Sequence, residues 1–404
     1  MTALRRWLAI LALALGGFGI GVTEFVTLGL LPNMAQDLLP AQYAADSAGA
    51  NATAGYLVSA YALGVVVGAP TIAALAARWP RKRLLIALVA VFVIGNLLSA
   101  LLPSFGLVLA ARFLSALPHG AYFGIASLVA ASLMGPGKRA RGVAFVLAGL
   151  AIANVIGVPI GTFVGQHFGW RTTYAVVAVI FALALVAIVL TVPFRRGDPS
   201  ATLRNELSAF TRPQVWLTLL VGSVGFGGIF AVYTYIAPVV TDVTGLSSGT
   251  VPFVLVAFGV GMTIGTFLAG WLTDRSVKRA LIVGISGVGL SVLGFALFAH
   301  TVPGLLIFVF LIGGFTGACS PAIQTRLMDV SHNAQSIAAA LNHSSLNIGN
   351  TLGAFLGGLA IAAGLGYTAP AFVGVALAAL GLAALALSYG VERRTRRRAL
   401  TTPR

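Results

Sequence analysis

The chain has 404 residues, of which 58% are hydrophobic and only 8% are charged. So few polar side chains cannot cover a soluble globule of this size, which excludes an ordinary soluble protein and favours residence in lipid. The formal net charge of +16 would suggest a nucleic-acid partner in a soluble chain, so its distribution has to be considered first. The single cysteine, Cys319, excludes an intramolecular disulfide and any multi-thiolate metal site.

Twelve apolar runs follow one another along the chain. A bilayer core of about 30 Å is crossed by about 20 helical residues. Because backbone polar groups find no water in hydrocarbon, each run must close its own hydrogen bonds as a helix, and none alternates like a strand. The sequence therefore predicts an all-α integral membrane protein with 12 transmembrane helices. The runs cover residues 7–31, 52–77, 84–102, 105–133, 143–165, 173–192, 215–236, 251–272, 280–298, 305–324, 338–363 and 369–389.

The first run contains a carboxylate, Glu24, whereas the other eight acidic residues fall at run ends, in connections or in the tail. An ionisable group inside a membrane costs roughly 3 kcal/mol or more and normally faces a bundle interior or a watery cavity. We therefore predict that Glu24 takes part in proton coupling; the alternative is a structural acid satisfied by a neighbouring helix. The run lacks a small-residue cleavage site, which predicts a retained helix and not a signal peptide.

The basic residues lie almost entirely on one side of the predicted membrane. With the amino terminus taken as cytoplasmic, 23 of the 25 lysines and arginines fall in cytoplasmic segments, and the exceptions are Arg112 and Arg171. This positive-inside bias predicts that both termini are cytoplasmic. The charge of +16 is then explained by topology and by anionic lipid of the inner leaflet, and no nucleic-acid partner is expected.

The twelve runs divide into two sets of six. A shift of 197 residues lays Gly64 on Gly261 and Gly68 on Gly265, which indicates an internal repeat. Two parallel six-helix repeats with a binding site between them at the midplane are a known plan for transporters. We predict an N-terminal six-helix bundle over 1–194, a cytoplasmic linker over 195–212, a C-terminal six-helix bundle over 213–390 and a basic cytoplasmic tail over 391–404.

A loop motif follows the eighth run, where Gly-Trp-Leu-Thr-Asp-Arg at 270–275 precedes two further basic residues. It resembles the cytoplasmic loop signature of the major facilitator superfamily. The copy in the first half keeps its basic residues but has Ala77 in place of the aspartate. The resemblance implies a cytoplasmic gate that latches the two halves; for the first copy the alternative is a cluster of positive charge only. The implied gate residues are Arg78, Arg81, Asp274, Arg275, Lys278 and Arg279.

Four more segments make the resemblance closer. Thr-Glu-Phe at 23–25 with Gly-Leu-Leu-Pro at 29–32, Arg-Lys-Arg-Leu at 81–84, Gly-Val-Pro-Ile-Gly at 157–161 and Gly-Trp-Arg at 169–171 are similar to the drug-proton antiporter branch. Within that branch the chain is most similar to bacterial sugar-efflux and arabinose-exporter-like proteins, and next to chloramphenicol exporters. The resemblance implies two pseudo-symmetric six-helix bundles in the inner membrane of a bacterium and proton-driven export, without naming the cargo.

Arg112 is the other costly residue, about seven residues into the fourth run. Glu24 lies at a similar depth, counted at about 1.5 Å per residue from the same side, so the two residues could meet. We predict that Arg112, which matches the arginine of the fourth-helix motif of the family, acts with Glu24 in proton coupling. The alternative is a snorkelling or purely structural arginine.

Other polar and aromatic side chains on the predicted helices are candidates to line a substrate cavity. In lipid, polar residues point inward, either to bridge helices or to wet a cavity, and aromatic residues also fill cores. His119 shares a helix face with Arg112; it could relay a proton or be a satisfied structural donor. The predicted cavity residues are His119, Tyr122, Phe123, Asn154, Tyr233, Tyr235, Gln324, His343, Asn347 and Asn350.

The leading hypothesis is a secondary active transporter that exports a small organic molecule, such as a sugar or chloramphenicol, against protons by alternating access. Uniport or proton-symport uptake is the alternative. The chain has no P-loop sequence to use ATP, and no nucleophile paired with a base or cluster of metal ligands, so no enzymatic activity, cofactor or metal is expected. A passive channel is disfavoured by the repeat and the gate-like loop. The expected partners are the small-molecule substrate, protons and the lipid bilayer, and the chain is expected to be a monomer.

Overall fold

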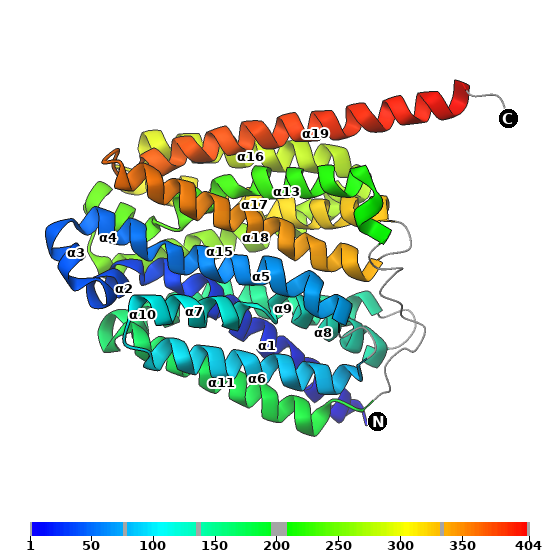
Figure 1. Cartoon of the computed structure of the whole chain (residues 1–404), viewed down its shortest axis with the longest axis horizontal. Coiled ribbons are helices and arrows are strands. Elements are labelled where there is room, and N and C mark those ends of the chain that lie inside the picture. Colours follow the sequence, from blue (N-terminus) through cyan, green and yellow to red (C-terminus); the bar gives the residue numbers. More distant parts are fainter. Residues whose placement is uncertain (1, 76–78, 135–138, 195–207, 332–334, 402–404) are drawn as a thin grey trace.

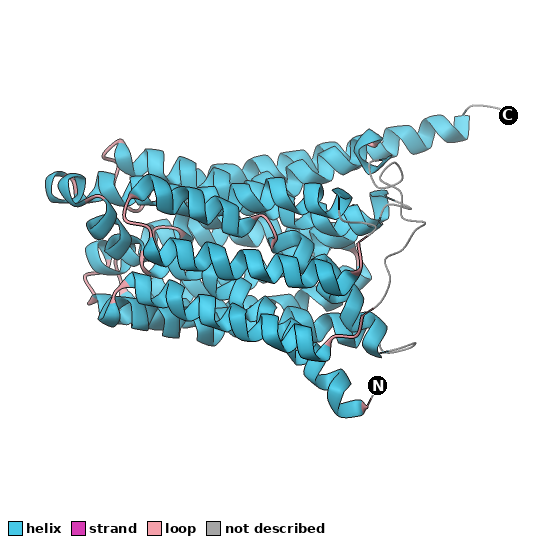
Figure 2. Ribbon diagram, turned by 60° about the horizontal axis from the view of Figure 1, so that its bottom comes forward, coloured by secondary structure: helices cyan, strands magenta, loops and turns pink. Residues whose placement is uncertain are grey.

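The computed structural model describes residues 2–75, 79–134, 139–194, 208–331 and 335–401. Within these ranges the chain is built from helices that run along a common direction (Figure 2). Twelve helical segments are long and apolar enough to cross a membrane, which confirms the predicted number. Two large clusters of buried hydrophobic residues lie among them: one is confined to the first half, and the other fills the second half and extends to first-half residues such as Phe25 and Val58.

The first six spans begin with α1 (Ala3–Gly29), and three short helices then lead into α5 (Tyr56–Leu75). The short helices are α2 (Leu31–Leu38), α3 (Pro40–Ala45) and α4 (Ser47–Ala54). The remaining spans are α6 (Arg81–Leu101), α7 (Phe105–Ala116) with α8 (His119–Met134), α9 (Arg139–Ile152) with the π-helical turn η1 (Ala153–Gly157) and α10 (Val158–Phe168), and α11 (Trp170–Thr191).

The second six spans follow the short η2 (Ser208–Thr211). They are α13 (Pro213–Tyr233), which leads into α14 (Ile236–Pro238), η3 (Val239–Val243) and η4 (Ser248–Thr250), then α15 (Val251–Arg275), α16 (Val277–Phe298), α17 (Val302–Ser331), α18 (Gln335–Ala362) and α19 (Ala369–Thr401). The predicted spans are confirmed, although α19 continues as a helix beyond the predicted boundary at residue 390.

Two spans of the first half are interrupted at prolines. Pro118 lies between α7 and α8, and Pro159 lies in the first turn of α10, directly after the π-helical turn. A proline has no N–H to donate and its ring clashes with the preceding turn. A π-helical turn absorbs such a mismatch by inserting one extra residue into the helix.

The internal repeat predicted from the glycines recurs as a repeat of contacts. A Cβ on Gly64 of α5 would strike the carbonyl oxygen of Phe113 in α7, and a Cβ on Gly261 of α15 would strike the carbonyl oxygen of Phe310 in α17. Phe113 and Phe310 are themselves separated by the same shift of 197 residues. Small residues allow such close helix approach in membranes, so each half uses the same backbone contact between its second and fourth spans.

One end of the molecule carries both the beginning of α1 and the end of α19 (Figure 1). We call this end the terminal face and the opposite end the far face. Exposed tryptophans stand at this end of the spans: Trp79 just before α6, Trp216 in the first turn of α13 and Trp271 near the end of α15. Exposed tryptophans gather at the boundary between lipid and water, so these residues mark the level of that boundary at the terminal face.

The two halves pack against each other mainly through α5 with α18 and through η1 and α10 with α15, and α1 adds contacts with α14 and α15. Near the far face, the rings of Phe25 in α1 and Phe230 in α13 stack with centroids 6.3 Å apart. Asn51 of α4 donates through Nδ2 to the Tyr367 hydroxyl at 2.8 Å. Burial raises the pKa of Tyr367 to about 12, so this hydroxyl stays neutral at physiological pH. These contacts hold the halves together at the far face.

Cys319 of α17 is completely buried against Gly284 of α16, as expected for a small apolar packing residue.

The predicted linker lies outside the described residues over 195–207, as does Arg78 of the predicted gate. The proposed domain boundaries therefore stay predictions.

Candidate functional site

Glu24 lies in the half of α1 nearer the far face, five residues before the helix ends at Gly29. At about 1.5 Å per residue it is roughly 30 Å along the helix from the terminal face. Its side chain is buried, with 8% of its surface exposed. Glu24 is the one carboxylate among the described residues that is buried inside a span, which agrees with its prediction as an unusual and costly group.

Arg112 of α7 is completely buried and lies beside the residue that precedes Glu24. Its Nη1 donates to the Thr23 hydroxyl at 3.1 Å, and that hydroxyl donates in turn to Oδ1 of Asn96 in α6 at 2.6 Å. The guanidinium also lies 4.3 Å from the ring centre of Tyr61 and 5.3 Å from that of Tyr174. Hydroxyl and aromatic groups thus hold the cation in place.

The predicted meeting of Glu24 and Arg112 takes an indirect form. No carboxylate oxygen of the described residues lies within 4.0 Å of the Arg112 guanidinium, whose direct polar partner is Thr23. The Nε and Nη2 donors of Arg112 have no hydrogen-bond partner among the described residues. Buried donors are normally satisfied, so these two are available to a water, a cargo group or the carboxylate itself.

A row of rings connects Arg112 to the second half of the molecule. The Tyr61 hydroxyl lies 3.3 Å from Nδ1 of His119 in α8. The imidazoles of His119 and His343 in α18 have ring centres 5.5 Å apart, and the Phe123 ring stacks on that of His343 at 5.3 Å. His119 is buried and His343 is half-buried. Three of the predicted cavity residues, His119, Phe123 and His343, therefore come together at the boundary between the halves.

Three predicted asparagines carry unused acceptors. Asn154 of η1 donates to the Leu150 carbonyl at 3.0 Å and Asn347 of α18 donates to the His343 carbonyl at 3.0 Å. The Oδ1 atoms of Asn154, Asn347 and Asn350 are buried and have no partner among the described residues. The three asparagines come from both halves of the molecule.

Each of the predicted tyrosines makes the contacts described here within its own half of the molecule. The Tyr122 hydroxyl donates to the Leu13 carbonyl at 2.7 Å, and the Tyr235 hydroxyl donates to the Ala354 carbonyl at 2.8 Å. The Tyr233 ring stacks on Phe258 with centroids 3.8 Å apart. These contacts fit helix bridging at least as well as cavity lining. Gln324 is half-buried in the terminal half of α17.

The described gate residues lie at the terminal face. Asp274 is exposed at the end of α15. The Arg275 guanidinium lies 3.4 Å from the ring centre of Trp271, and the Lys278 amine lies 5.2 Å from that of Tyr389. Arg279 is exposed and Arg81, in the first half, is half-buried. The contacts described for Arg275 and Lys278 stay within the second half, so no latch to the first half is formed by them.

Sequence reasoning missed the groups that hold Arg112. Thr23, Tyr61, Asn96 and Tyr174 surround it, and none was predicted as a site residue. Thr23 and Asn96 interrupt apolar runs and could have been noticed for that reason, but the tyrosines resemble ordinary core residues. Two six-helix groups, with a buried carboxylate and a buried arginine inside the first and a histidine pair at their boundary, have the organisation of a membrane transporter.

Comparison with known proteins agrees with this class. The family model described as Major Facilitator Superfamily matches residues 13–256 and 233–404. The chain is 38% identical to the Inner membrane transport protein YdhP of Escherichia coli (strain K12), over 92% of this chain and 94% of the relative. The chain therefore belongs to the Major Facilitator Superfamily, a family of membrane transporters for small molecules.

Further relatives and a solved structure extend the comparison. The chain is 33% identical to the Putative transporter AraJ of Escherichia coli (strain K12), over 98% of this chain and 97% of the relative. It is 35% identical to the Chloramphenicol resistance protein of Streptomyces lividans, over 88% of each chain. The crystal structure of a D-xylose-proton symporter matches with a TM-score of 0.71 at 18% identity, over 93% of this chain and 97% of that one. This last likeness shows the fold.

Proposed function

We propose that this transporter exports a small organic molecule in exchange for protons by alternating access. The observation that carries the proposal is Glu24, a buried carboxylate inside a span, next to the residue that binds the buried Arg112. A proton or a cargo shifts a two-state equilibrium only through its different affinity for the two states. An ionisable group at this depth binds a proton with different affinity in the two states whenever water reaches the group in one state and not in the other.

The proposed sequence begins with the far face closed, as in the contacts of Phe25 with Phe230 and of Asn51 with Tyr367. Cargo enters from the terminal face and binds between the halves near His119 and Asn347. Rocking of the halves then exposes the cargo and Glu24 to the far side. We place both termini in the cytoplasm of a bacterium, because basic residues gather at the terminal face.

The direction of proton movement tests this proposal against its alternatives. The purified protein is reconstituted into vesicles that contain a trapped pH dye, and chloramphenicol or a sugar panel is added outside. Chloramphenicol is a reasonable first probe because of the relative from Streptomyces lividans. Proton movement opposite to cargo movement supports exchange. Movement in the same direction would support symport, and cargo movement without protons would support uniport; either result overturns the proposal.

The orientation is tested separately. A green fluorescent protein fused after residue 404 should fluoresce in bacterial cells, because it folds in the cytoplasm. A dark but abundant fusion would place the carboxyl terminus outside and reverse the proposed direction.

A further inference from the structure

A groove opens at the terminal face between α16 and α19, away from the boundary between the halves. It has a volume of about 360 Å³. It is lined by Lys278, Ile282, Leu382, Leu385, Ala386, Tyr389, Gly390 and Arg393. None of these residues belongs to the chain of contacts from Thr23 through Arg112 to His343, so the groove is a separate feature of the second half.

The groove has a cationic end and an apolar end. Lys278 lies in the first turn of α16 and Arg393 lies toward the terminal end of α19, so both cations are at the terminal face. Ile282 and Leu382 line the part nearer the membrane centre. Leu382 and Arg393 are 11 residues apart on one helix, which corresponds to about 16 Å along its axis. The groove therefore spans the boundary between lipid and water.

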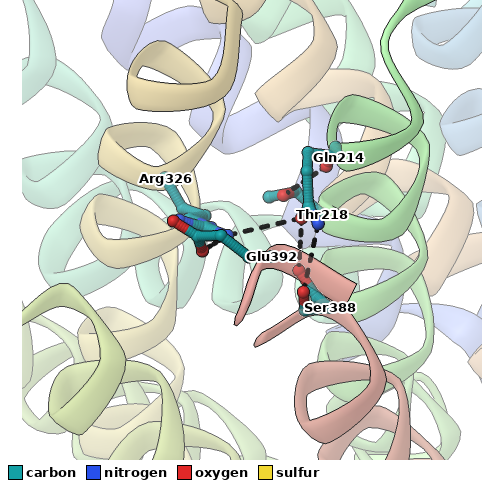
Figure 3. Close-up of polar contacts among 5 residues, drawn as sticks. All are labelled: Gln214, Thr218, Arg326, Ser388 and Glu392. Carbon is teal, nitrogen blue, oxygen red and sulfur yellow. Dashed lines mark hydrogen bonds and ion pairs between the residues drawn. The ribbon is translucent and has the colours of Figure 1, made fainter. Parts of the chain in front are cut away.

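A polar cluster holds this end of α19 in place (Figure 3). Arg326 of α17 pairs with Glu392 at 2.8 Å. The Ser388 hydroxyl donates to Oε1 of Gln214 in α13 at 2.8 Å, and Nε2 of Gln214 donates to the Ser388 carbonyl at 3.1 Å. Because the cluster joins three helices, the wall of the groove formed by α19 is fixed to the rest of the second half.

The cluster also determines which basic side chains near the groove have an ion-pair partner. Arg326 is engaged with Glu392, and its guanidinium lies 4.6 Å from the ring centre of Tyr389. Lys278 lies 5.2 Å from the same ring centre. In the part of the chain that the structure describes, neither Lys278 nor Arg393 has a carboxylate oxygen within 4.0 Å. Two positive charges therefore remain at the mouth of the groove without an ion-pair partner there.

We propose that this groove binds a phospholipid with an anionic headgroup, such as phosphatidylglycerol. The phosphate would lie between Lys278 and Arg393, and an acyl chain would follow Ile282, Leu382 and Ala386 toward the membrane centre. Charge complementarity selects an anionic lipid over a zwitterionic one, because basic pockets between helices attract anionic headgroups on the side of the membrane where they lie. The proposal does not depend on the cargo or on proton coupling.

Native mass spectrometry of the full chain tests this proposal directly. The protein is released from mixed micelles that contain equal amounts of phosphatidylglycerol and phosphatidylcholine, and retained lipids are counted. The parent should retain one phosphatidylglycerol in preference to phosphatidylcholine. The double change Lys278→Gln with Arg393→Gln should weaken this retention by about 25-fold, or about 5-fold for each cation. The matched control is Arg279→Gln with Arg394→Gln, which removes two neighbouring exposed charges outside the groove.

A second pair of variants tests the apolar end without changing charge. Ala386→Phe fills the groove and should reduce retention, whereas Ala383→Phe places the same ring on an exposed position of α19 outside it. Equal loss in both charge variants, or equal retention in both phenylalanine variants, would overturn the proposal. So would displacement of the lipid by inorganic phosphate at the same concentration, because that would define an anion site without an acyl-chain groove.

Discussion

Replacement of Glu24 by glutamine removes the proton-binding group and keeps the size and hydrogen-bonding capacity of the side chain. Glu24 is buried in the half of α1 that lies nearer the far face. The other carboxylates of the described residues are exposed, partly exposed or near span ends. None of them can replace Glu24 at its depth. We therefore expect Glu24→Gln to abolish transport driven by a pH gradient while leaving exchange of cargo for cargo partly intact.

The expected cargo gradient can be calculated for the exchange of one proton for each cargo molecule. Transport of a neutral cargo against one proton comes to rest when the cargo ratio equals the proton ratio. A difference of one pH unit corresponds to about 1.4 kcal/mol and so supports a cargo ratio of about tenfold. We expect about tenfold for the parent and no gradient for Glu24→Gln. If His119 carried a second proton, the parent would instead reach about a hundredfold.

The assay uses vesicles with a fixed pH difference and a clamped membrane potential, and measures labelled cargo inside and outside at rest. Asp329→Asn, which neutralises an exposed carboxylate at the terminal face, serves as the matched control and should keep the parent ratio. A tenfold gradient built by Glu24→Gln would refute the reasoning, since the carboxylate would then be structural and coupling would reside elsewhere.

Three other changes give direct tests of the fold and the site. Gly265→Ala should lower the thermal unfolding temperature, because the added Cβ would clash with the backbone of α17 and overpacking costs about 1–3 kcal/mol. The control Gly270→Ala should leave the unfolding temperature unchanged, because open space surrounds Gly270. Thr23→Val should destabilise by about 1–3 kcal/mol, because it removes the hydroxyl that Arg112 and Asn96 share; unchanged melting would exclude that role. A disulfide between Tyr56→Cys and Phe355→Cys, whose parent rings stack at 6.0 Å, should close the far face and stop transport until it is reduced. Full activity with the bond formed would contradict rocking of the halves.

The spans and the repeat were predictable because each depends on a strong local signal. Apolar length identifies a span, and the glycine spacing at Gly64 and Gly261 reports a contact that is repeated in both halves. Glu24 and Arg112 were identifiable for the opposite reason, since a charge inside an apolar run is rare enough to be informative.

The details of the site were harder to predict because they depend on helix orientation. Thr23 interrupts an apolar run, but a hydroxyl inside a span costs little, so the interruption does not reveal the role of Thr23 until Arg112 is seen to bind it. Tyr122 and Tyr235 were predicted to line a cavity, but their hydroxyls donate to backbone carbonyls. Composition cannot distinguish a tyrosine that bridges helices from one that stacks on a cargo, because both need the same buried ring and one polar partner.

The complete burial of Cys319 makes the natural chain a ready background for spectroscopic labelling. A water-soluble maleimide cannot reach a thiol that has no exposed surface, so an introduced cysteine becomes the reactive one without alteration of α17. Trp79→Cys and Trp271→Cys would place spin labels on exposed positions of the two halves at the terminal face. The distance distribution between such labels, recorded as pH and cargo are varied, would follow the opening of that face in the otherwise unaltered protein.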